Sequence, residues 1–177
     1  GHGGDVDIAA GQGAAGGNVQ LFAGAGGLST GGSVTISSGS STTSDSGNMF
    51  LRTADAGTSG DSGFMHLNTG TAVAGSSGEV KFGSADSAVG SSGAFVVAVG
   101  TGAVGNGGEV LISAGSTTAR SAAGGSVLLS AGAGKHPQTG AGGSVDVVGG
   151  TAKAMTGGSI QILSGQSEHS TSGNVIV

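Results

Sequence analysis

A nine-residue phrase of alternating polar and apolar residues recurs along the whole chain. In Gly31–Gly39, which reads GGSVTISSG, Val34 and Ile36 lie two residues apart among small and polar neighbours. Close copies begin at Gly3, Gly16, Gly107, Gly124, Gly142 and Gly157, and looser copies begin at Ser46, Ser62, Ser77, Ser92 and Ser172. An apolar residue at every second position is typical of a strand with one buried face, so each phrase predicts a β-strand.

The spacing of the phrases predicts how these strands stack. Successive phrases begin 13 to 18 residues apart, and most intervals are 15 residues. Helical repeats and propeller blades need periods of about 33–45 residues. A shorter period suits one coil of a β-solenoid, whose coils stack through parallel ladders about 4.8 Å apart. The sequence therefore predicts an all-β fold, a parallel β-solenoid (β-helix) without helices, in which residues 1–177 form a single repeat array.

Two columns of apolar residues are the predicted core of this solenoid. The first column is Val6, Val19, Val34, Met49, Met65, Val80, Phe95, Val110, Val127, Val145, Ile160 and Val175. The second column is Ile8, Leu21, Ile36, Leu51, Leu67, Phe82, Val97, Ile112, Leu129, Val147, Ile162 and Val177. Two residues after the second column the residue is small, for example Ala10, Ala23 and Ser38, which predicts a flat and narrow section.

Composition and charge exclude several classes of function. The chain has 42 Gly and only 8% charged residues, a composition usual for disorder, but the regular spacing of the aliphatic residues favours order. A net charge of −5 with five Lys and Arg argues against nucleic-acid partners and anionic membrane surfaces. There is no Cys, and no apolar run approaches the roughly 18–20 residues of a membrane span, so no membrane insertion is expected.

Candidate chemistry is sparse. Gly11–Gly16 matches the glycine pattern of a dinucleotide-binding turn, but no helix is predicted after it. Asp5 and Asp7 could offer oxygen ligands to Ca²⁺, but the pair does not recur from phrase to phrase as in calcium-binding repeats. The four histidines, at positions 2, 66, 136 and 169, show no ligand spacing. We therefore expect no enzyme, no cofactor and no metal.

One outward-facing position carries aliphatic residues in three consecutive intervals. Val96, Leu111 and Leu128 lie between the two core columns, with Lys81 before them and Asp146 after them. In stacked coils these three residues would form an apolar ridge, and a contiguous apolar row usually marks an interface. We predict that the ridge packs laterally against a second chain. The alternative is that the longest insertion, Gly132–Gly142, folds over it.

Both ends of the chain carry the ordinary phrase. Solenoids normally close with atypical polar repeats, which protect the unpaired backbone groups of the last coil. The sequence starts at Gly1 without Met, and SGNVIV ends it in mid-pattern. We therefore expect a piece of a longer protein or a rod that continues head to tail into another copy.

The GGxVxI phrase, present in nearly all of the chain, resembles the Gly/Ser-rich tandem-repeat β-solenoids of surface and extracellular proteins. The resemblance implies a structural or adhesive role outside the cell, with copies of the chain itself as partners. The expected function is a building block of an extracellular fibre, cell wall or surface appendage, and the alternative is an adhesin-like, ice-binding or glycan-binding module. Ser/Thr clusters such as Ser37–Ser46 could carry O-glycans.

Overall fold

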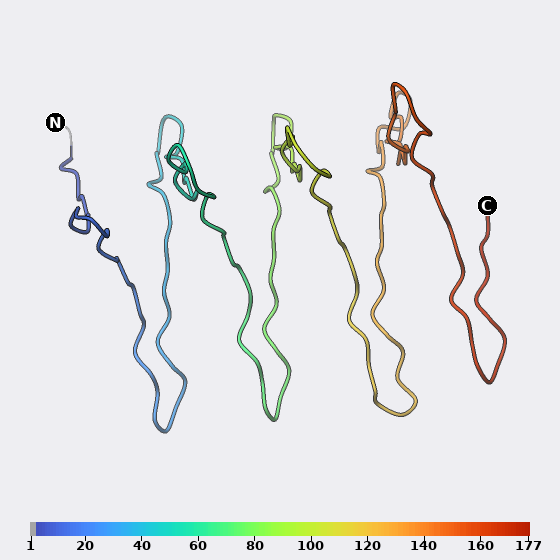
Figure 1. Ribbon diagram of the computed structural model, residues 1–177, viewed down its shortest axis with the longest axis horizontal. Coiled ribbons are helices and arrows are strands. Elements are labelled where there is room, and N and C mark those ends of the chain that lie inside the picture. Colours follow the sequence, from blue (N-terminus) through green and yellow to red (C-terminus); the bar gives the residue numbers. More distant parts are fainter. Residues whose placement is uncertain (1–2) are drawn as a thin grey trace. The chain divides into compact units, whose positions relative to one another are not determined.

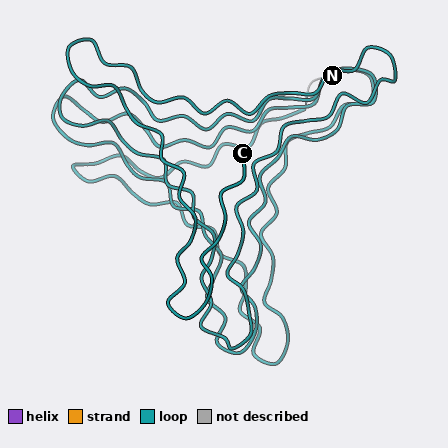
Figure 2. Cartoon of the chain, turned by 90° about the vertical axis from the view of Figure 1, so that its right-hand side faces the viewer, coloured by secondary structure: helices purple, strands orange, loops and turns teal. Residues whose placement is uncertain are grey.

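The computed structural model describes residues 3–177, and this part of the chain contains neither a helix nor a β-strand. Figure 1 traces the chain as long irregular arms joined by turns, and Figure 2 shows loops and turns throughout the described residues. The chain divides into two compact units, Gly1–Ala85 and Asp86–Val177. The same repeat runs through both units.

The predicted β-solenoid is wrong. No ladder of strands forms among residues 3–177, and no apolar side chain of this range is buried. The two columns expected in the core are exposed, from 48% at Val80 to 117% at Val177. Each phrase supplies only two to four large apolar residues, and its glycines lose the most conformational entropy on ordering. A single phrase therefore cannot bury its own apolar side chains.

The repeat is visible instead as a series of bends. Each interval between two successive phrases contains one bend within the described residues. The bends cover residues 13–15, 27–29, 42–44, 58–60, 73–75, 88–90, 103–106, 119–121, 137–139, 153–155 and 168–170. The period that the sequence predicts for solenoid coils is thus the period at which the chain reverses direction.

Backbone hydrogen bonds between glycines close many of these bends. In each closure the N–H of the second residue of a phrase donates to the carbonyl of the ninth residue of the preceding phrase, as in Gly32 to Gly24 at 2.8 Å. The same bond joins Gly17 to Gly11, Gly47 to Gly39, Gly125 to Gly115, Gly143 to Gly132, Gly158 to Gly150 and Gly173 to Gly165, at 2.8–2.9 Å. We call these bonds the glycine closures.

Glycine is favoured at the donor position of several closures because the two backbones approach closely there. A Cβ added at Gly32 would lie 3.3 Å from the amide nitrogen of Gly24, and one added at Gly158 would lie 3.0 Å from that of Gly150. The eighth residue of the preceding phrase faces the same point. Four eighth-position residues, Ala10, Thr69, Ala131 and Gly149, are the only described residues that are partly buried. The eighth position of the phrase is therefore where successive phrases meet.

A β-branched residue at the eighth position accompanies the absence of a closure. Among the described residues, no closure spans the intervals that follow Thr53, Thr69, Ser84 and Val99, and the eighth residue is β-branched in three of these four. A Cβ added at Gly108 would lie 2.8 Å from Cγ1 of Val99, and one added at Gly78 would lie 3.4 Å from Cγ2 of Thr69. In closed intervals the neighbouring backbone occupies this space. A branched methyl, held by its restricted χ1 rotamer, keeps the two backbones apart.

This relation predicts the effect of shortening Val99. In Val99→Ala the methyl groups beside Gly108 are removed, so we expect the Gly108 amide to donate to the Gly100 carbonyl. Hydrogen exchange of the Gly108 amide should slow by about fivefold, the effect of one net hydrogen bond of ~1 kcal/mol. Val104→Ala, in the next bend, removes a similar side chain that is 93% exposed and serves as the control. Unchanged exchange at Gly108 in Val99→Ala would contradict the steric explanation.

Candidate functional site

The predicted ridge lies on the surface of the second unit. Val96, Leu111 and Leu128 are 78%, 83% and 87% exposed, so no part of the chain covers them. The loop considered as a cover, Gly132–Gly142, is instead tied to its own base by the bond from Gly143 to Gly132. The second-column residues of these phrases, Val97, Ile112 and Leu129, are also exposed. The three ridge residues are therefore exposed together with the second-column residues of the same phrases.

A further set of aliphatic side chains projects from the bends, and sequence reasoning missed it. Its members are at least 88% exposed: Leu28, Val73, Val89, Val104 and Met155. Each is the single large aliphatic residue in the segment between two phrases. That isolated aliphatic residue at a bend was the signal in the sequence. The bends thus add apolar surface to that of the phrases.

Hydroxyl groups hold several of the bends and form a second periodic feature. The Oγ of Ser41 accepts hydrogen bonds from the amides of Thr43 and Ser44, at 3.3 and 2.9 Å. The hydroxyls of Ser87, Thr117 and Ser167 likewise accept from the amides of Gly90, Ala119 and Ser170. All four acceptors occupy the eleventh position counted from the start of their phrase. Aligning the intervals by phrase would have shown this Ser/Thr position, which suits a side-chain-to-backbone turn.

The acceptor serines and threonines also bear on modification. A hydroxyl oxygen that accepts a backbone N–H stabilises the bend by itself, without a glycan. Ser41 lies inside the Ser37–Ser46 cluster in which O-glycans were considered, and its Oγ has this local structural role. O-glycosylation of the cluster stays a prediction.

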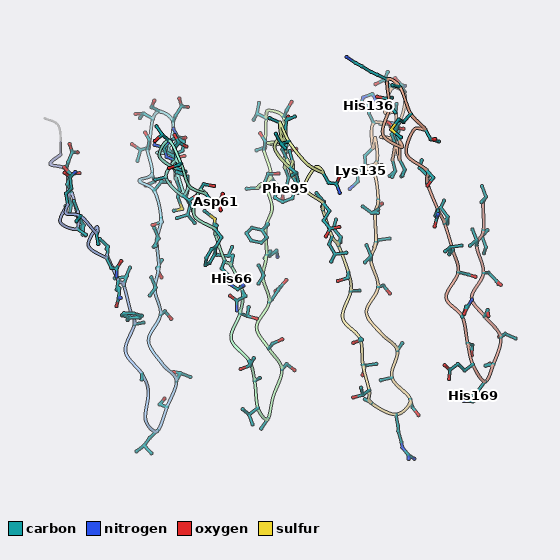
Figure 3. The ribbon with its side chains drawn as sticks, in the orientation of Figure 1. Asp61, His66, Phe95, Lys135, His136 and His169 are labelled. Carbon is teal, nitrogen blue, oxygen red and sulfur yellow. The ribbon has the colours of Figure 1, made fainter. Side chains whose placement is uncertain are left out.

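Among the described residues the ionisable side chains form no metal-binding cluster. Within residues 3–177 no group of three His, Asp or Glu side chains has the geometry to hold a metal ion. Asp5 and Asp7 belong to no such group, and His2 lies outside the described residues. Figure 3 shows His136 and His169, both of the second unit, on separate turns of the chain. In the same unit, Asp146 accepts only a hydrogen bond from the hydroxyl of Ser144, at 3.0 Å.

The remaining candidates lack the features of a binding site. One hollow of about 330 Å³ is lined by the four consecutive residues Arg52, Thr53, Ala54 and Asp55. These residues are exposed, whereas ligand sites enclose their ligand among groups from several segments. The glycine pattern Gly11–Gly16 leads into a bend and the closure from Gly17 to Gly11, with no helix after it. Its glycines therefore serve the chain reversal.

Comparison with known proteins shows no relative: no protein family, curated protein or solved structure matches the chain. Among the described residues no helix has the length and apolar character needed to cross a membrane. The features that remain are the exposed apolar side chains, the glycine closures and the hydroxyl-held bends.

The hydroxyl acceptors can be tested at Ser41. Ser41→Ala leaves the amides of Thr43 and Ser44 without their acceptor, a loss of about 0.5–1.5 kcal/mol for a typical hydrogen bond. We expect hydrogen exchange of the Ser44 amide to accelerate by about twofold to tenfold. Ser41→Thr, which keeps the hydroxyl, should preserve the protection of Ser44. Equal exchange in wild type and Ser41→Ala would show that the hydroxyl does not hold the bend.

Proposed function

We propose that this chain is a self-associating structural module, a building block of an extracellular fibre, cell wall or surface appendage whose copies contact one another laterally, end to end, or both. The observation that carries the proposal is the exposure of every large apolar side chain of the repeat. These side chains are too numerous and too regular to be incidental surface residues.

The exposed area supports association with a partner. The isolated chain has an accessible surface of 17711 Å². A compact monomer of the same mass exposes about 7,400 Å², and a fully extended chain about 23,300 Å². Apolar surface left in water is the largest available source of favourable free energy, because its burial is worth roughly 25 cal/mol per Å². A partner that covers the apolar phrases would release this free energy.

The spacing of the apolar pairs favours a second copy as that partner. The pairs recur every 13 to 18 residues, and the intervals are irregular at fixed places. A surface that contacts many pairs at once must carry complementary groups at the same intervals. Another copy of the chain has the same spacing because it has the same sequence. An unrelated globular partner would match only one or two phrases.

The charge distribution permits such contacts. The chain has only five Lys and Arg and ten Asp and Glu among 177 residues. Few charges therefore have to be moved out of water when phrases meet, and the net charge of −5 is small. Charged groups that lose water without a partner oppose association strongly. The sparse charge of the phrases favours close contact between copies.

The proposal is tested by placing a charge on an apolar pair. Val34 is 51% exposed, so we expect Val34→Asp to leave the isolated chain unchanged, in contrast to its effect in the solenoid predicted from the sequence. At a contact between copies the same carboxylate loses water, so self-association should weaken by about tenfold or more, equivalent to at least ~1.4 kcal/mol. Sedimentation velocity over a concentration series measures the association.

Thr35→Asp is the matched control, because it adds the same charge to the neighbouring polar position of the same phrase. We expect it to weaken association much less than Val34→Asp. A wild-type chain that stays monomeric at every concentration would overturn the proposal. Binding of the monomer to glycans or to ice crystals would then favour the alternative module.

The contribution of the ridge is separable from that of the columns. The double variant Leu111→Ser with Leu128→Ser should reduce lateral association, and Ile112→Ser with Leu129→Ser removes a matched pair from the second column of the same phrases. If lateral contact uses the ridge, the first double variant lowers the mean particle width in electron micrographs more than the second does. Equal effects would mean that the ridge is not the preferred contact.

A further inference from the structure

The loop Gly132–Gly143 is held by an imidazole, unlike the bends held by hydroxyl groups. Nδ1 of His136 accepts hydrogen bonds from the amides of Thr139, at 3.2 Å, and Gln138, at 3.4 Å. Oγ1 of Thr139 lies 2.9 Å from the same nitrogen. The carbonyl of His136 also accepts the amide of Gly140, at 3.1 Å. Figure 3 labels His136 and its neighbour Lys135 on this loop.

These contacts define the protonation state of the imidazole. A backbone amide can only donate, so Nδ1 must present its lone pair to Gln138 and Thr139. With these two amides donating, Nδ1 acts as an acceptor and carries no proton. A proton added at Nδ1 would convert the acceptor into a donor and break both hydrogen bonds, leaving the exposed amides to water. The Thr139 hydroxyl has a lone pair and could accept from the protonated ring.

We propose that His136 is a pH-sensitive switch of this loop: protonation at Nδ1 releases the amides of Gln138 and Thr139 and loosens the turn at residues 137–139, which the backbone bond from Gly140 to His136 still closes. The imidazole side chain ordinarily gains its proton within the mildly acidic range. The switch is independent of the proposed self-association, because it depends only on contacts within one loop.

The surroundings of the ring support a local switch. Besides His136, the segment Gly132–Gly143 contains one ionisable residue, Lys135, and the residues on the turn itself, Pro137, Gln138, Thr139 and Gly140, carry no charge. No carboxylate is present in this segment to replace the lost acceptor. The base of the loop, the closure from Gly143 to Gly132 at 2.9 Å, involves only backbone groups and is insensitive to the proton. The change is therefore confined to the tip.

A second histidine provides an internal control. His169 also lies in a bend, at residues 168–170, but the amide of Ser170 there donates to the hydroxyl of Ser167 at 2.9 Å. A hydroxyl does not change its charge in the mildly acidic range. Protonation of His169 should therefore leave this bend intact, whereas protonation of His136 should loosen its own.

The experiment is an NMR titration of the full chain labelled with ¹⁵N, from pH 8 to pH 5. We expect the amide signals of Gln138 and Thr139 to move with the same midpoint as the ring nitrogens of His136. The hydrogen-exchange protection of Thr139, corrected for intrinsic rates, should fall by roughly fivefold at the acidic end. The protection of Ser170 should not change while the ring of His169 titrates.

Two variants make the result decisive. In His136→Asn the side-chain carbonyl can accept the same amides but does not titrate, so Thr139 should keep its protection at both ends of the range. In His136→Ala the protection should be low at both ends. The proposal would be overturned if the hydrogen-exchange protection of Thr139 stayed constant over this pH range, or if it fell equally in His136→Asn.

Discussion

The close approach of two glycine backbones is the constraint on which the described structure depends. At each closure the second residue of one phrase donates its N–H to the ninth residue of the phrase before, as in Gly47 and Gly39 at 2.8 Å. A side chain on the donor glycine would crowd this contact in several closures, as at Gly158, and a branched side chain at the eighth position accompanies the loss of a closure, as at Val99. Small residues at three places of the phrase thus determine where the chain is tied to itself.

Because these ties are made by backbone groups of small residues, the large aliphatic side chains take no part in them. They stay exposed on the phrases and on several bends, for example Leu111 at 83% and Leu28 at 106%. In this chain, backbone hydrogen bonds between small residues determine where the chain bends. The large apolar side chains take no part in these bonds and remain available to contact another surface. Their availability is the physical basis for the self-associating role proposed above.

The bends differ in the chemistry that holds them. Ser41 and Ser167 use hydroxyl oxygens, which accept amides at any ordinary pH, whereas His136 uses a ring nitrogen whose lone pair is lost on protonation. The eleventh position of the interval specifies the first kind, and the long insertion around Pro137 supplies the second. Among the described residues, the bend at 137–139 is thus the one whose side-chain acceptor is an imidazole.

The sequence by itself determined the repeat, its period and the positions of its glycines, because each is a property of the local sequence and does not depend on the fold. From the same residues the partly buried eighth position could be expected to be small, as Ala10 and Ala131 are. The tertiary structure alone decided what the alternating apolar pairs contact. A period of two, as at Val34 and Ile36, predicts a strand only if another strand pairs with it, and that pairing is a long-range choice that no local pattern specifies. In the described residues the backbone groups pair at the glycine closures instead, and so the columns predicted as core lie at the surface.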